Sequence, residues 1–77
     1  MNALELRWMM LGEARQFAGW LREQRHPNAW SSGDFGKGWT RGALTAHLGF
    51  LREHLRHVPR KLRRDCGEMI RTQLIGK

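Results

Sequence analysis

Apolar residues recur every three or four positions over residues 3–25, which is the spacing that gathers side chains on one face of an α-helix. Asn2 precedes this segment and is a favourable N-cap, so we expect a helix that ends at about Arg25. Its apolar residues form two sets that together cover more than half of the circumference: Leu4, Trp8, Leu11, Ala14, Ala18 and Leu21, and Leu6, Met9, Met10, Phe17 and Trp20. Such a helix is packed on two sides or contributes to an interface. Gly12 and Gly19 lie seven residues apart on it and permit a close helix approach.

Residues 26–39, HPNAWSSGDFGKGW, have the composition of a loop. Pro27, Gly33, Gly36 and Gly38 interrupt the helical pattern, and serine and asparagine occupy positions between them. The glycines lack the GxxxxGK[ST] spacing of a phosphate-binding loop. The segment also holds three large aromatic residues: Trp30, Phe35 and Trp39. These rings either cap a small core or form an aromatic recognition surface for bases or a protein partner.

Two further helical patterns follow this loop. Thr40 is a suitable N-cap, and a heptad-like seam follows it at steps of four and three: Leu44, Leu48, Leu51, Leu55 and Val58. Pro59 separates this seam from a last helix, which we expect from Pro59 to about Leu74 with Gly76 after its end. That helix has an apolar face formed by Leu62, Cys66, Met69, Ile70 and Leu74. The prediction is a single all-α domain over residues 1–77, a small bundle of three to four helices with one Gly/Trp-rich loop.

Gly49 leaves two interpretations open for residues 44–64. It either lies inside one amphipathic helix or makes the turn between two short helices, and we favour the turn. With Leu48-Gly49-Phe50 at that turn, the segment resembles the helix-turn-helix of phage repressors and related regulators over about residues 40–60. Thr45 and Leu51 depart from the small and polar residues usual at their places in that family.

The resemblance implies a regulator of transcription that contacts duplex DNA through residues 40–64, with a second helix that begins near Leu51. Arg52, Glu53, Arg56 and His57 are then expected to face the major groove. Six other residues are expected to hold phosphates: Thr40, Arg41, Arg60, Lys61, Arg63 and Arg64. In a continuous helix the same charged residues form a solvated face instead.

The net charge of +7 is concentrated at the C-terminal end, because residues 51–77 hold eight Lys and Arg against three Asp and Glu. This asymmetry favours an acidic partner, and duplex DNA is the leading expectation. The alternative is a protein-interaction module or small inhibitor that docks on an acidic host protein through its aromatic loop and basic helices. Adsorption to a membrane is disfavoured, since the apolar faces are needed for the core. A homodimer is compatible with either function.

Cys66 is the only cysteine, so no internal disulfide is possible, and we expect a cytoplasmic protein without a signal peptide or a membrane-spanning helix. Its thiol is expected to be buried and inert, or else activated by Arg63 and Arg64. The histidines do not have the spacing of a metal site together with Cys66. No nucleophile-base pair or paired carboxylates stand out. We therefore expect no enzymatic activity, no metal and no cofactor.

Overall fold

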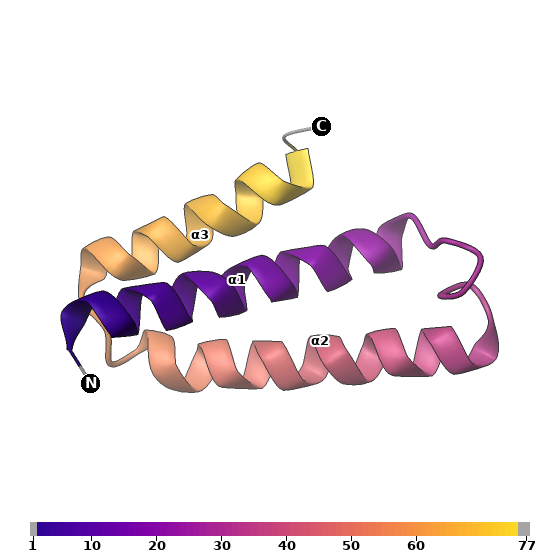
Figure 1. The fold of residues 1–77 in the computed structure, drawn as a ribbon, viewed down its shortest axis with the longest axis horizontal. Helices are drawn as coiled ribbons and strands as arrows, with labels where there is room; N and C mark the ends of the chain where they lie inside the picture. The colour runs from indigo at the N-terminus through magenta and orange to yellow at the C-terminus, as the bar shows by residue number, and fades with distance from the viewer. Residues whose placement is uncertain (1, 76–77) are drawn as a thin grey trace.

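The chain forms three helices in the computed structural model, which describes residues 2–75 and has no strand within them. Helix α1 spans Ala3–Arg25, α2 spans Asp34–Leu55 and α3 spans Arg60–Ile75. The molecule is elongated, with extents of 40 × 24 × 17 Å (Figure 1). The predicted all-α class is confirmed, with three helices. None of the described helices is both long and apolar enough to cross a bilayer.

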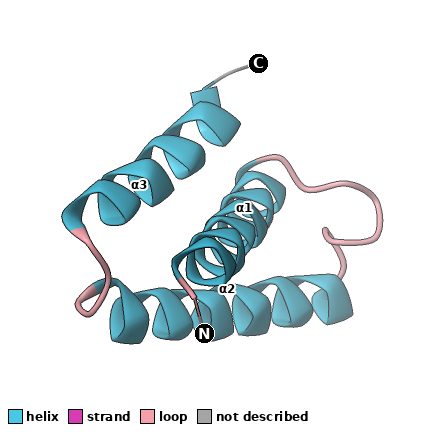
Figure 2. Cartoon of the chain, turned by 60° about the vertical axis from the view of Figure 1, so that its left-hand side comes forward, coloured by secondary structure: helices cyan, strands magenta, loops and turns pink. Residues whose placement is uncertain are grey.

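Helix α1 is the centre of the fold. It packs against both α2 and α3, whereas α2 and α3 barely touch each other (Figure 2). The buried cluster lies between all three helices near the α2–α3 turn and consists of Met10, Ala14, Leu51, Val58, Leu62 and Cys66. Since α2 and α3 flank α1 without closing around it, part of the α1 surface stays uncovered.

The start of α1 follows the prediction from the sequence. The Asn2 side chain accepts a hydrogen bond from the Glu5 backbone N–H at 2.7 Å, and the Glu5 carboxylate accepts from the Asn2 N–H at 3.2 Å. This reciprocal capping box satisfies two N–H groups that have no partner within the helix. Asn2 is therefore confirmed as the N-cap, and the helix ends at Arg25 as expected.

Helix α2 begins seven residues earlier than predicted. Gly33 is its N-cap and Asp34 its first residue, so the loop is confined to residues 26–33 and the prediction of Thr40 as N-cap is wrong. Thr40 is instead buried inside α2, where its hydroxyl donates to the Gly36 carbonyl at 2.8 Å. A Cβ on Gly36 would lie 2.2 Å from the Trp30 carbonyl oxygen. The glycine therefore serves close packing of the loop on the first turn of α2, rather than interrupting the helix.

The predicted turn at Gly49 is wrong. Gly49 lies within the continuous helix α2, and no glycine of the described chain has a positive φ. A single internal glycine destabilises a helix by about 1 kcal/mol relative to alanine, which the burial of nearby Leu51 offsets. The chain reverses at residues 56–59 instead, and α3 begins at Arg60, one residue after the predicted start. Gly76, expected after the end of this helix, lies outside the described residues.

The apolar patterns are buried only in part. Leu51 and Val58 of the predicted seam are buried, Leu44 and Leu55 are half-buried, and Leu48 is exposed. On α1 the alternative in which the helix is packed on two sides is wrong for two residues, because Leu4 is 76% and Trp8 is 82% exposed. The helix has apolar residues on more of its circumference than its two neighbours cover.

Candidate nucleic-acid interface

Six cations lie around the α2–α3 turn, and we call them the basic corner: Arg52, Arg56, Arg60, Lys61, Arg63 and Arg64. Arg52 and Arg56 are four residues apart at the end of α2, so they share one helix face; Arg60 and Arg64 share a face of α3 in the same way. Between Arg52 and Arg64 the only acidic residue is Glu53. With six cations against one acid, these 13 consecutive residues hold a net charge of +5 out of the +7 of the whole protein.

Contacts with the backbone and the core fix the shape of the corner. The Arg63 Nε donates to the Leu55 carbonyl oxygen at 3.1 Å, which joins the first turn of α3 to the last turn of α2. Val58 and Leu62 are buried beneath the turn. The positions of the cations relative to one another are thus set by tertiary contacts.

One acidic side chain beside the corner is neutralised from within the fold. Asp65 accepts from Arg7 of α1 at 2.7 Å and from Lys61 at 3.1 Å. These hydrogen bonds, that from Arg7 foremost, hold the pKa of Asp65 below its ordinary value. Asp65 therefore ties α3 to α1 and partly neutralises Lys61, but among the described residues it forms no ion pair with an arginine of the corner.

Four arginines of the corner are available to a partner. Within residues 2–75 none of Arg52, Arg56, Arg60 and Arg64 forms an ion pair, and all four are exposed. A guanidinium group presents a planar set of donors that fits the oxygens of a phosphate in a bidentate contact. The corner therefore has the charge and the chemistry of a phosphate-binding surface.

The residues predicted to read bases lie at this corner, but not on a recognition helix. Arg52 and Glu53 lie in the last turn of α2, Arg56 is the C-cap, and His57 is exposed in the turn. A helix-turn-helix presents the first residues of its second helix to base edges. Because no helix begins near Leu51, Arg52, Glu53 and Arg56 lie at the wrong end of a helix for that mode of recognition.

Two predicted phosphate contacts do not join the corner. Thr40 is 4% exposed and its hydroxyl is already bonded, so it offers nothing to a phosphate. Arg41 is exposed, but it precedes Arg52 by 11 residues, which is about 16 Å along the axis of α2. It lines a separate pocket of about 250 Å³ together with Lys37, whose role no sequence motif indicated.

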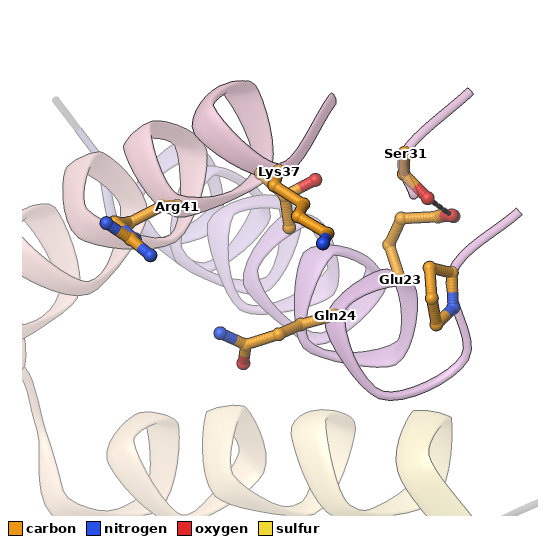
Figure 3. Close-up of a pocket in the computed structure, with 7 residues that line it drawn as sticks. Glu23, Gln24, Ser31, Lys37 and Arg41 are labelled. Atoms are coloured by element: carbon orange, nitrogen blue, oxygen red, sulfur yellow. Dashed lines mark hydrogen bonds between the residues drawn. The ribbon is translucent and has the colours of Figure 1, made fainter. Parts of the chain in front are cut away.

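This pocket lies between the C-terminal end of α1 and the start of α2 (Figure 3). On its far side the Glu23 carboxylate accepts from the Ser31 hydroxyl and from the Asn28 N–H, the latter at 2.9 Å. The hydrogen bond from Ser31, followed by that from Asn28, lowers the pKa of Glu23. Glu23 therefore stabilises the loop as a carboxylate, and Lys37 and Arg41 form a second, smaller cationic cluster.

The three aromatic residues of the predicted recognition surface lie together, outside the core. Trp30 and Phe35 are in edge contact with ring centroids 6.2 Å apart, and Phe35 stacks on Trp39 at 6.0 Å. Phe35 is 71% exposed, and both tryptophans are at least half exposed. The alternative in which these rings cap the core is therefore wrong.

The histidines and the thiol have structural contacts. The Nδ1 of His47 lies 3.1 Å from Glu13 of α1, and His54 stacks on Phe50. Cys66 is buried, and burial raises the pKa of its thiol, so the predicted inert thiol fits the structure better than an activated one. Among residues 2–75 no group of three or more His, Cys, Asp and Glu is placed to hold a metal ion.

Comparison with known proteins provides no assignment. No protein-family model, no curated protein and no solved structure matches this chain. Any proposal on its function therefore depends on its own charges and surfaces.

Proposed function

We propose that the protein binds duplex DNA and that the basic corner contacts the phosphate backbone. The observation that carries the proposal is a group of four exposed arginines around the α2–α3 turn, none of which forms an ion pair within residues 2–75. Since Gly49 lies inside a helix, the proposed contact does not use a helix-turn-helix. Binding through phosphates positions a protein on DNA and carries little sequence information by itself.

The proposal makes a quantitative claim about salt. Each phosphate contact releases condensed counterions, so the logarithm of the binding constant falls with the logarithm of salt concentration by about 0.9 per contact. Removal of two arginines that each contact a phosphate should lower this slope by about 1.8. At about 0.15 M salt the same loss corresponds to roughly a 30-fold weaker affinity.

The experiment compares two double variants with the wild type by fluorescence anisotropy on a labelled duplex over a range of salt concentrations. Arg60→Ala/Arg64→Ala removes two cations of the basic corner, and Lys37→Ala/Arg41→Ala removes the same net charge from the other cluster. All four side chains are exposed, so both variants are expected to fold. The corner variant should bind roughly 30-fold more weakly at about 0.15 M salt, and its salt slope should be lower by about 1.8. The control variant should lose less affinity and less of the slope.

Two results would contradict the proposal. The first is no binding of the wild type to duplex DNA at low salt. The second is an equal loss in the two double variants, because this would indicate attraction by net charge rather than a site at the corner.

The aromatic cluster supports a second candidate, docking on an acidic protein surface. Three exposed aromatic rings in mutual contact are unusual on a solvated surface, and aromatic residues are enriched at binding hot spots. Retention of an acidic protein that depends on Trp39, without retention of nucleic acid, would favour this candidate over DNA binding. Loss of DNA binding in Trp39→Ala would instead connect the cluster to the DNA contact.

A further inference from the structure

The pocket between the end of α1 and the start of α2 has walls of opposite charge (Figure 3). Lys37 and Arg41 of α2 form the cationic wall, and Glu23 of α1 is the acid across from them. In Figure 3 the Lys37 side chain extends from α2 toward the end of α1 that carries Glu23 and Gln24. Within residues 2–75 neither Lys37 nor Arg41 forms an ion pair with any acid. The pocket therefore presents two cations and one carboxylate to a ligand.

The Glu23 carboxylate is held in place through only one of its two oxygens. The Ser31 hydroxyl and the Asn28 N–H both donate to Oε2. Among the described residues no donor is bonded to Oε1. Ser31 is itself 3% exposed, so the group that fixes Glu23 belongs to the folded interior of the loop. Oε1 is thus an acceptor in a fixed position, and a positively charged N–H donor is the partner that binds a carboxylate most strongly.

The two cations have a spacing that the helix sets. Lys37 and Arg41 are four residues apart on α2, which places their Cβ atoms about 5–6 Å from each other. Thr40 beside them is buried, and its hydroxyl donates to the Gly36 carbonyl, so this turn of α2 is anchored. Two carboxylates at the ends of an extended five-carbon chain are separated by about 5 Å, the length of its four bonds. Such a chain matches the pair of cations.

We propose that this pocket binds a free acidic amino acid of the size of glutamate. Its two carboxylates contact Lys37 and Arg41, and its ammonium group donates to Oε1 of Glu23. Two cations against one acid give the pocket a net charge of +1, which the ligand's net charge of −1 balances. The volume of about 250 Å³ is below the roughly 300–1,000 Å³ of sites for drug-sized molecules, as a ligand of about ten non-hydrogen atoms requires.

The experiment titrates the protein with L-glutamate by isothermal calorimetry, in a buffer without phosphate or other carboxylates. For a ligand this small we expect a Kd on the order of 1 mM or tighter. Glutarate lacks the ammonium group, and L-glutamine has a neutral amide in place of one carboxylate. Each should bind about tenfold more weakly, because each loses one charge-assisted hydrogen bond. Glutarate thereby tests the role of Glu23 without a change in the protein.

Three single variants locate the site. Lys37→Gln and Arg41→Gln should each weaken the binding of L-glutamate by about tenfold. Arg52→Gln is the matched control, since it removes the same charge from the basic corner, and it should leave the Kd unchanged. All three side chains are exposed, so the variants are expected to fold, which circular dichroism verifies.

Three results would overturn the proposal. The first is no saturable binding of L-glutamate at about ten times the expected Kd. The second is binding of glutarate or inorganic phosphate as tight as that of L-glutamate, because this would indicate attraction of any anion without a role for Glu23. The third is an equal loss in Arg52→Gln, which would indicate net charge rather than the pocket. No nucleic acid is present in these titrations, so this proposal and the binding of duplex DNA can each fail without the other.

Discussion

Gly49→Ala tests whether the chain is straight where the sequence favoured a turn. In the structure Gly49 has a helical φ and nothing within 4 Å of its Cβ position, so alanine meets no obstacle. Alanine should then stabilise α2 by about 1 kcal/mol, through its better helix propensity and the smaller entropy of the unfolded chain. For a chain of this length, 1 kcal/mol raises the Tm by about 4–8 °C. Thermal unfolding followed by circular dichroism at one protein concentration measures the change.

Gly36→Ala is the contrasting substitution in the same helix. Its Cβ would lie 2.2 Å from the Trp30 carbonyl oxygen and 2.5 Å from the Ser31 Cα, both of them backbone atoms that cannot move away cheaply. Overpacking of this kind destabilises the folded protein by about 1–3 kcal/mol. At the upper end of that range the cost is larger than the gain of about 1 kcal/mol in helix propensity. The Tm should fall in Gly36→Ala while it rises in Gly49→Ala. A lower Tm in Gly49→Ala would refute the straight helix, because alanine is strained in a left-handed turn.

Two further predictions concern single side chains. Asp65→Asn should lower the Tm at neutral pH, because the folded state holds the pKa of Asp65 below the ordinary value of 3.8; the stabilisation is therefore present above that value and lost as the pH falls below it. Two results would contradict this role. One is a Tm difference between Asp65→Asn and the wild type that is as large at pH 2 as at pH 7. The other is a difference at pH 7 equal to that caused by Glu53→Gln. Cys66 should react with thiol reagents only as fast as the protein unfolds, since it is buried and its pKa is raised. Prompt reaction of the native protein would show that the core opens locally.

The helix ends that depend only on neighbouring residues were the most predictable. The capping box at Asn2 and the proline before α3 act within a few residues of the chain, so the sequence indicates them directly. The start of α2 was missed because Gly33, Gly36 and Gly38 resemble helix breakers. The physical reason for Gly36 lies in a contact with Trp30, and a contact between loop and helix has no periodic signature in the sequence.

The candidate site was predictable in composition but not in arrangement. The surplus of arginine after residue 51 is visible in the sequence, and it predicted which residues would be exposed and charged. Which of them gather at one place depends on where the chain turns. Moving the turn from Gly49 to residues 56–59 brings the residues at both ends of that turn into one corner and leaves Arg41 about 16 Å away along α2.

The sequence by itself determined an all-α protein with a capped first helix, a last helix after Pro59 and a strongly basic C-terminal third, because helix periodicity, capping and net charge are properties of neighbouring residues. Only the tertiary structure decided that α2 runs straight through Gly49 and that Trp8 is left in solvent. Both follow from which surfaces meet. Leu51 is buried in the core together with residues of α1, and its burial offsets the cost of about 1 kcal/mol of a glycine inside α2. Two flanking helices, in contrast, are too few to cover the apolar circumference of α1.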